Sequence, residues 1–400
     1  MVEGLQVRGL RARRDRRGPV AGTSVAVLAW TALVCVGFLG SALLATDTVV
    51  GGYNASAYWV SYRDGFVKRG LPGAVLETVV GGPPGLLAAS VFGAALIVLA
   101  LAALALLVRM TVRAVPAPAH RLVGAALVIA SPFTFALVVQ NRGRYDLIVV
   151  VCLVLAAWLA SSRSLPWLRA AGISALVAVG AASMEIAFGF LGPLAERIGL
   201  GALALLPGLA VTAASLIAPP AGSALVAASE RAAAAGLPIT AAQESSISAL
   251  GQNLSDALAF TASVSPLSIL LCAAVLGGCY ALSAYLLWVV TGRVRPRLVL
   301  AVVAVNALVA LVLSAVGTDY RRWWGLAFVA TAAGLVLLAR DVPRVPAARH
   351  ADERPWRRLL VAGLLASAVL QVFPIWPTWE PSASTNASLE HVLHHGTSAG

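Results

Sequence analysis

The feature that most constrains this chain is a series of long segments in which nearly every side chain is apolar. Residues 86–108 and 298–316 contain no charged side chain and show no polar face. Each is long enough to cross the hydrocarbon core of a bilayer, which takes about 20 helical residues. Strands of a membrane barrel alternate apolar and polar side chains, so segments that are apolar on every side favour helices. The sequence predicts an all-α fold, a polytopic transmembrane helical bundle.

The composition agrees with this class and bears on cofactors and partners. Charged residues make up only 12% of the chain, whereas about a quarter of the residues of a soluble domain are charged. The four cysteines lie inside apolar segments without the spacing of metal ligands, so we interpret them as small core residues. A net charge of +12 would suggest nucleic acid in a soluble protein. Here the basic residues are explained by the membrane, and no nucleic-acid partner is expected.

Eleven spans are expected if each takes about 20 apolar residues. They lie near 21–45, 86–109, 122–139, 147–161, 170–184, 186–199, 200–218, 267–291, 298–317, 324–340 and 358–375. The segment 186–199 is short and contains Gly192, Pro193, Glu196 and Arg197, so a re-entrant or broken helix is the alternative there.

The distribution of arginines predicts the orientation. Residues 1–17 hold six arginines, which the positive-inside rule assigns to the cytoplasm. Eleven spans then leave 21 of the 29 basic residues inside and the carboxy terminus outside. We therefore expect a basic cytoplasmic arm at 1–20, a transmembrane bundle at 21–375 and an exterior tail at 376–400.

Two long loops are expected on the exterior face, at 46–85 and 219–266. The second begins with two prolines and is rich in alanine and serine, with helix-like stretches around 221–235 and 241–260. This pattern predicts an amphipathic cap or lid. The hydropathy pattern leaves no room for a soluble domain of useful size. We therefore expect the functional site at the exterior face, in these loops.

Eight basic residues fall on the exterior side against the rule. One is Arg231, in the second long loop, and the other seven lie in three short clusters at 62–70, 140–146 and 318–324. Each cluster combines an acid with arginines and aromatic residues. The acids are outnumbered locally, and a guanidinium fork suits phosphate and carboxylate oxygens. The clusters therefore predict an anionic ligand. The alternative is that Asp64, Asp146 and Asp319 neutralise neighbouring arginines while the aromatic rings form an interfacial belt.

Two further acids lie at the exterior boundary. Glu185 lies between two apolar runs without a basic neighbour in the sequence. We expect it to pair with an arginine of another loop or with a substrate hydroxyl. The alternative is a solvated boundary residue. Asp47 lies where the first span ends, and a solvated helix-end acid is the simpler interpretation for it.

The inside amino terminus, the many spans, the long first exterior loop and the acids and arginines at the outer face together resemble the GT-C superfamily of integral membrane glycosyltransferases. The segment Asp64-Gly65-Phe66-Val67-Lys68-Arg69-Gly70-Leu71, followed by Arg144-Tyr145-Asp146 and Asp319-Tyr320-x-Arg322-Trp323, is also similar to bacterial polytopic proteins related to polysaccharide polymerases. The chain departs from the superfamily in lacking an adjacent acid pair in that loop and a large carboxy-terminal soluble domain.

The resemblance implies transfer of a sugar from a polyprenyl-phosphate-linked donor to a cell-envelope glycan or lipid acceptor, at the exterior face of a bacterial plasma membrane. Asp64 or Asp47 would be the catalytic base. The expected phosphate-binding residues are Arg63, Lys68, Arg69, Arg142, Arg144, Arg321 and Arg322. The expected orienting or sugar-binding residues are Asp146, Glu185, Asp319, Tyr320 and Trp323. Flat faces for sugar or isoprenoid are expected from Tyr58, Trp59, Trp323 and Trp324.

No cofactor is required by this chemistry. Several carboxylates could hold a divalent cation, but nothing in their spacing demands one. The rival hypothesis is a transporter or flippase for an anionic lipid-linked substrate, which would use the same arginines. The region 186–207, with Pro193 and Pro207, resembles the discontinuous helices of transporters.

Overall fold

The computed structural model describes the middle of the chain. The described residues are 55–116, 118–129, 131–135, 137–138, 143–162, 164–184, 187, 189–190, 201–217, 222–237, 247, 250, 255, 258–259, 262, 266–291, 296–316 and 320–341. The expected arm, the first and last expected spans, most of 186–199 and the tail lie outside this set.

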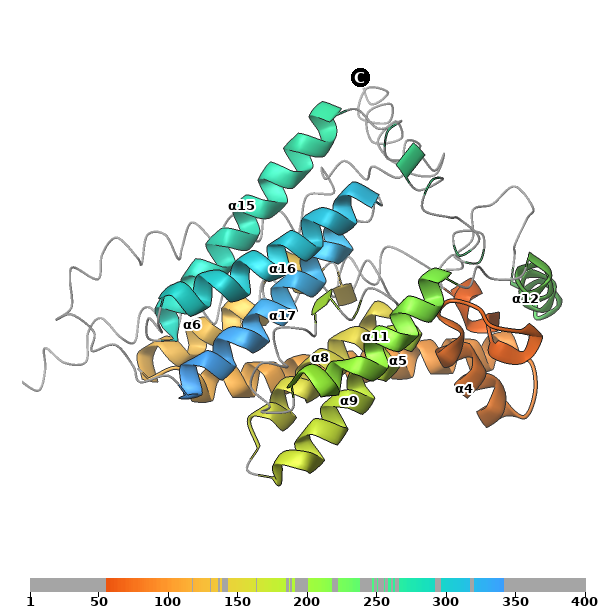
Figure 1. The fold of residues 1–400 in the computed structure, drawn as a ribbon, viewed down its shortest axis with the longest axis horizontal. Helices are drawn as coiled ribbons and strands as arrows, with labels where there is room; N and C mark the ends of the chain where they lie inside the picture. Colours follow the sequence, from red (N-terminus) through yellow and green to blue (C-terminus); the bar gives the residue numbers. More distant parts are fainter. Residues whose placement is uncertain are drawn as a thin grey trace, which may run out of the picture.

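Throughout the described residues the secondary structure is helical, and no strand occurs there (Figure 1). The helices are η1 Ser56–Trp59, η2 Tyr62–Asp64, α4 Gly70–Val80, α5 Leu86–Ala114, α6 Pro118–Ile129, α7 Pro132–Phe135, α8 Asp146–Ala160, α9 Pro166–Ser183, α11 Gly201–Ile217, α12 Gly222–Ala234, α15 Pro266–Val290, α16 Pro296–Val316 and α17 Tyr320–Asp341. Among them, α5, α9, α15, α16 and α17 are long and apolar enough to cross a membrane. The prediction of an all-helical bundle is confirmed, and these five helices are the candidates for membrane spans among the described residues.

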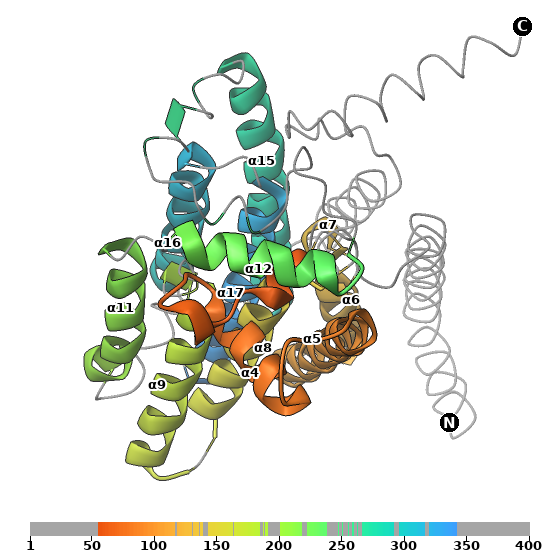
Figure 2. The ribbon, with the colours of Figure 1, turned by 90° about the vertical axis from the view of Figure 1, so that its right-hand side faces the viewer.

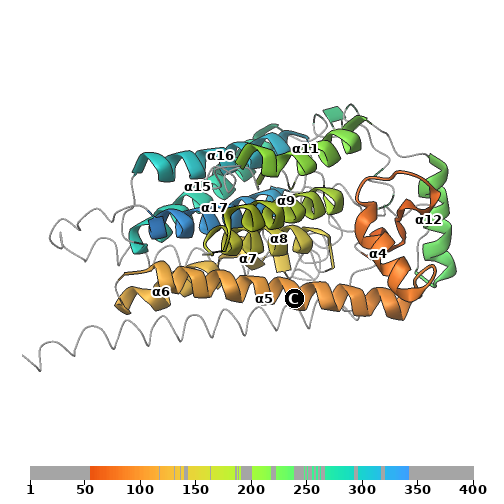
Figure 3. The same ribbon diagram turned by 60° about the horizontal axis from the view of Figure 1, so that its bottom comes forward.

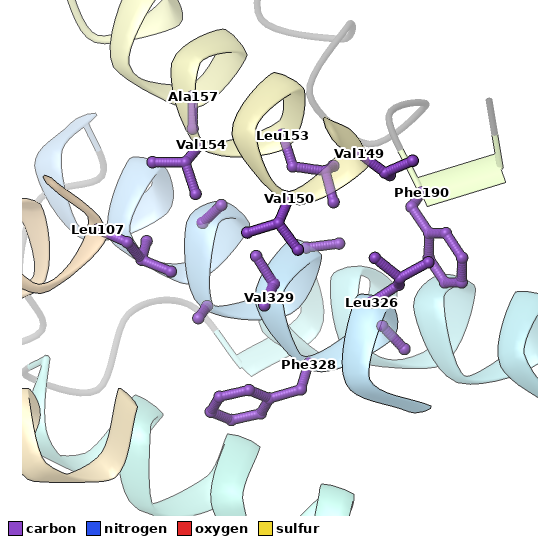
Figure 4. Close-up of a cluster of buried hydrophobic side chains, with 14 of the residues drawn as sticks. Leu107, Val149, Val150, Leu153, Val154, Ala157, Phe190, Leu326, Phe328 and Val329 are labelled. Atoms are coloured by element: carbon purple, nitrogen blue, oxygen red, sulfur yellow. The ribbon is translucent and has the colours of Figure 1, made fainter. Parts of the chain in front are cut away.

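Helix α17 forms the centre of the bundle. Of its most apolar 18-residue window 94% is buried, against 22–33% for the other four long helices. Side chains of α5, α8 and α17 interlock in the core around Leu107, Val150, Val154 and Val329 (Figure 4). A Cβ on Gly334 would lie 2.8 Å from Val302, so this glycine lets α16 approach α17 closely, as small residues do between membrane helices.

The outer faces of the peripheral helices are apolar. On α5, Leu87 is 79% and Val98 64% exposed, and on α16 Leu300 and Leu308 are 68% and 61% exposed. In water such surfaces would be costly, whereas lipid tails solvate them without penalty. These faces therefore fit contact with lipid.

The structure divides one helix that the hydropathy pattern joins. The expected span 122–139 is interrupted after α6, and the short helix α7 begins at Pro132. Pro132 has no backbone N–H and disfavours helical backbone at the preceding residue. The Ser131 hydroxyl accepts a hydrogen bond from the Phe133 backbone N–H at 3.3 Å, which caps the start of the new helix.

The two expected long loops come together at one end of the bundle. The first contains η1, η2 and α4, and the second contains α12, which lies across that end, transverse to α5 (Figures 2 and 3). Helix α12 packs on η1 and η2 through Ala224, Ala228 and Ala232, which recur every four residues and so share one face. The sequence predicted an amphipathic cap or lid in this loop, and α12 confirms the helix expected around 221–235. We call η1, η2, α4 and α12 together the cap.

Candidate functional site

Two tyrosines join the cap to the turn before α8. The Tyr58 hydroxyl donates to the carbonyl of Gly143, and the Tyr145 hydroxyl donates to the carbonyl of Ala57 at 2.8 Å. The centroids of the two rings lie 5.8 Å apart. Burial raises the pKa of both hydroxyls, so both remain protonated donors at neutral pH. This reciprocal bonding brings the second polar cluster against η1.

A buried ion pair joins the second cluster to the third. Arg322 Nε lies 3.2 Å from Asp146 Oδ1, and the two side chains are 7% and 2% exposed. The guanidinium carbon of Arg322 lies 4.0 Å from the centroid of the Trp323 ring. Asp146 begins α8 and Arg322 lies in the first turn of α17, so the pair fixes the starts of two core helices against each other.

A second ion pair joins the first cluster to α12. Arg231 Nη1 lies 2.6 Å from Asp64 Oδ2, with side chains 17% and 28% exposed. The Nη2 group of the same arginine donates to the carbonyl of Trp59 at 3.2 Å. Asp64, the expected base, is therefore held by a cation from the other long loop rather than by its neighbours in sequence.

A third pair lies within the cap, where Arg63 Nη1 contacts Glu77 Oε1 at 3.0 Å. Burial raises the pKa of Glu77, but hydrogen bonds from Ser61 and Arg63 and the charges of Arg63 and Arg231 outweigh burial and lower the pKa below its usual value. Glu77 is thus ionised at neutral pH. Because the charge of Arg231 also lowers the pKa of Glu77, the pair of Arg63 and Glu77 and the pair of Asp64 and Arg231 form one network.

The other expected cations lie around these pairs. Lys68 and Arg69 are half-buried just before α4, where Arg69 takes a left-handed conformation with φ of 60°. Lys68 forms no ion pair with any residue that the structure describes. Arg69 lies near enough to Tyr145 to affect its pKa. Arg144 and Arg321 are half-buried, beside the buried pair in sequence.

The aromatic residues expected to face a ligand are buried. Tyr320 is 5%, Trp323 6% and Trp324 2% exposed. Tyr58 and Trp59 are 0% and 1% exposed, and the Trp59 indole donates to the carbonyl of Pro84 at 2.8 Å. Tyr58 and Trp59 therefore pack the cap against the bundle and present no flat face in this conformation.

Four expected site residues lie outside the described part of the chain, namely Asp47, Arg142, Glu185 and Asp319. Within the described part, no three His, Cys, Asp or Glu side chains gather as metal ligands would.

The sequence interpretation did not include Arg231 and Glu77 among the site residues. Arg231 is the one basic residue between 219 and 266, which was the available signal, because a single cation in a loop assigned to the exterior breaks the positive-inside rule as the clusters do. Glu77 is a single acid in the short apolar helix Gly70–Val80 and lies outside the three basic clusters' local pattern of paired charges.

Comparison of the chain with models of protein families, with curated proteins and with solved structures found no match.

Proposed function

We propose that this protein is a membrane glycosyltransferase that moves a sugar from a polyprenyl-phosphate-linked donor to a cell-envelope glycan or lipid acceptor. The observation that supports the proposal is the convergence of the three polar clusters. They are far apart in the sequence, yet Tyr58 and Tyr145 hold the second cluster against η1, which directly precedes the first cluster, and the pair of Asp146 and Arg322 joins the second cluster to the third. A site of this kind can surround a lipid phosphate with several cations.

The chemistry assigned to the site is a single displacement. The acceptor hydroxyl loses its proton to a carboxylate, Asp64 or Asp47, as its oxygen forms a bond to the anomeric carbon. The bond from that carbon to the phosphate oxygen breaks, and its electron pair stays on the polyprenyl phosphate. Cations such as Lys68 and Arg69 stabilise the departing phosphate. No metal is needed to balance these steps.

We also propose the orientation predicted from the sequence, with eleven spans, the amino terminus in the cytoplasm and the cap outside a bacterial plasma membrane. Helices α6 and α12 lie at opposite ends of α5 (Figure 3). At the end away from the cap, α5 finishes with Arg109 and Arg113, and α6 begins near Arg121. Arg297 begins α16 and Arg340 ends α17. This basic end supports a cytoplasmic assignment.

A transporter or flippase for an anionic lipid-linked substrate is the second candidate, and one observation favours it. Near the middle of α15, α16 and α17, Tyr280, Asn306 and Thr331 form a buried hydrogen-bond network, with the Tyr280 hydroxyl 2.6 Å from Thr331 Oγ1. Polar groups at the midplane of a bundle are typical of transport pathways.

The experiment that tests the proposal is label transfer in nanodiscs. The purified protein is incubated with a panel of radiolabelled polyprenyl-phosphate sugars and membrane glycan acceptors. We expect transfer by the wild type and by Glu230→Gln, which removes an exposed acid of α12 outside the site. Asp64→Asn should abolish transfer while leaving lipid binding largely intact. Full activity of Asp64→Asn would remove Asp64 as the base, and binding without transfer across the panel would favour transport.

A further inference from the structure

The pair of Asp64 and Arg231 differs from an ordinary structural ion pair in what it connects. It joins the proposed catalytic carboxylate to a helix that enters the site from a distant part of the chain. The side chain of Arg231 is 17% exposed and that of Asp64 is 28% exposed, so water can reach both partners. Ion pairs accessible to water exchange their partners at little cost in free energy, because solvent compensates each separated charge.

The attachment of α12 beside this pair is weak by composition. Its fully buried residues are Ala224, Ala228 and Ala232, and Leu225 packs beside them only partly buried; an alanine buries only one methyl group. Two polar contacts supplement them within the described residues, and both belong to Arg231: the bond to Asp64 and the bond to the carbonyl of Trp59. A ligand that competes for this guanidinium therefore competes for most of the directional bonding of α12.

We infer that Arg231 is an exchangeable counter-ion of Asp64 and a phosphate-binding residue of the same site. In this structure Arg231 holds the Asp64 carboxylate. A phosphate group that enters beside Lys68 takes the Arg231 guanidinium, which can bind two phosphate oxygens at once. The exchange releases Asp64 to accept the proton of the acceptor hydroxyl, so the base becomes available only when a phosphate is bound. This inference rests on the proposed function.

The position of Arg231 suits this exchange. Its charge also acts on Glu77, which keeps Arg63 as its own partner at 3.0 Å. When Arg231 turns to a phosphate, Glu77 therefore remains neutralised. Asp64 is left without a cation, but its partial exposure lets water solvate the freed carboxylate.

A distance measurement tests the exchange without relying on activity. Spin labels are placed on α12 and α4 by Val226→Cys and Val79→Cys, at positions that are 58% and 79% exposed, in a chain whose native cysteines are replaced by alanine. Double electron–electron resonance in nanodiscs compares the protein alone with added polyprenyl phosphate, polyprenol or inorganic phosphate. We expect polyprenyl phosphate to lengthen the distance between the labels, and polyprenol to leave it unchanged.

The phosphate arms distinguish the source of the anion. Lengthening with polyprenyl phosphate alone assigns the site to a lipid phosphate, whereas lengthening with inorganic phosphate as well assigns it to the phosphate group itself. No change with either ligand would overturn the inference.

Binding by variants supplies the second readout. Arg231→Gln should bind polyprenyl phosphate about tenfold more weakly, as expected for one lost charge-assisted hydrogen bond. Arg231→Lys should lose less, and the neighbouring Glu230→Gln should bind as the wild type does. Wild-type affinity in Arg231→Gln would contradict the inference. If that variant also transferred sugar normally, the proposed function would stand without the exchange. If polyprenyl phosphate lengthened the distance between the spin labels but no sugar were transferred, the exchange of Arg231 would be supported and the proposed glycosyl transfer would be rejected.

Discussion

Two pairs of aspartate and arginine connect distant parts of this chain, and they lie in different surroundings. Asp146 and Arg322 are almost completely buried between the starts of α8 and α17, whereas Asp64 and Arg231 remain partly exposed between η2 and α12. A buried pair cannot separate without leaving an unsolvated charge, but a partly exposed pair can. The same two residue types thus form a fixed framework contact in one place and an exchangeable contact in the other.

The largest effect is expected from breaking the buried pair. Asp146→Ala leaves the Arg322 guanidinium buried without its carboxylate and should lower the free energy of unfolding by about 3–5 kcal/mol. Thermal unfolding in detergent would measure it. The double variant Asp146→Asn with Arg322→Met removes both charges and should recover most of the loss. A loss no greater for Asp146→Ala than for Asp64→Ala would refute the distinction between the pairs.

A smaller effect is expected where the cap packs by close contact rather than by charge. A Cβ on Gly73 would lie 2.0 Å from the carbonyl oxygen of Val60. Gly73→Ala should therefore push α4 from the segment after η1 and cost about 1–3 kcal/mol. Gly82→Ala is the matched control, since a Cβ there meets nothing within 4 Å. Equal unfolding temperatures for the two variants would show that α4 does not pack as described.

Breaking the partly exposed pair of Asp64 and Arg231 should have a still smaller effect. Arg231→Gln is expected to lower the free energy of unfolding by less than about 1 kcal/mol. Salt sharpens the comparison, because the Debye length falls to about 3 Å in 1 M salt and charges that water can reach are screened much more than buried ones. The difference between Arg231→Gln and the wild type should shrink in 1 M sodium chloride, while the loss in Asp146→Ala should persist. Equal salt dependence of both would place the two pairs in similar surroundings.

The smallest effect on stability is expected from protonating Glu77 at low pH. Because the pKa of Glu77 is lower in the folded cap than its ordinary value of 4.5, its ionised form contributes stability that is complete above that value. This contribution is lost as the pH falls from 4.5 through the lowered pKa. Unfolding temperatures measured below pH 5 should therefore fall less steeply in Glu77→Gln than in the wild type. Parallel curves would show that Glu77 has no such role.

The helices were predictable from the sequence because burial in lipid leaves a direct record in hydropathy. Helices α5 and α16, with mean hydropathies of 3.0 and 2.7, were recognised at once. The same measure predicted α17, as the span near 324–340, but could not show that this helix lies at the centre of the bundle. Helix α17 has a mean hydropathy of only 1.5 although 94% of its window is buried, because a helix surrounded by other helices can carry polar groups that a lipid-facing helix cannot.

The site was predictable in its residue types but not in its pairings. The sequence placed Asp64 and Asp146 beside arginines of their own clusters, yet their partners are Arg231 and Arg322. Arg231 and its acceptor at Trp59 are 172 positions apart. Such contacts depend on how helices pack, which local pattern does not record. Pro132 is a local signal for the break between α6 and α7, but the apolar residues on both sides of it make 122–139 read as one continuous span.

The central place of α17 also has a consequence for how the protein is made. Helix α8, with Asp146 at its start, leaves the ribosome long before Arg322 has been synthesised. The nascent bundle must therefore accept an acid at the start of α8 and keep open the space that α17 will fill. A chain that ends before residue 320 lacks both the partner of that acid and the helix against which α5, α8, α15 and α16 pack. Assembly of this bundle is consequently completed from its carboxy-terminal side, and truncated chains should be substrates for membrane proteases.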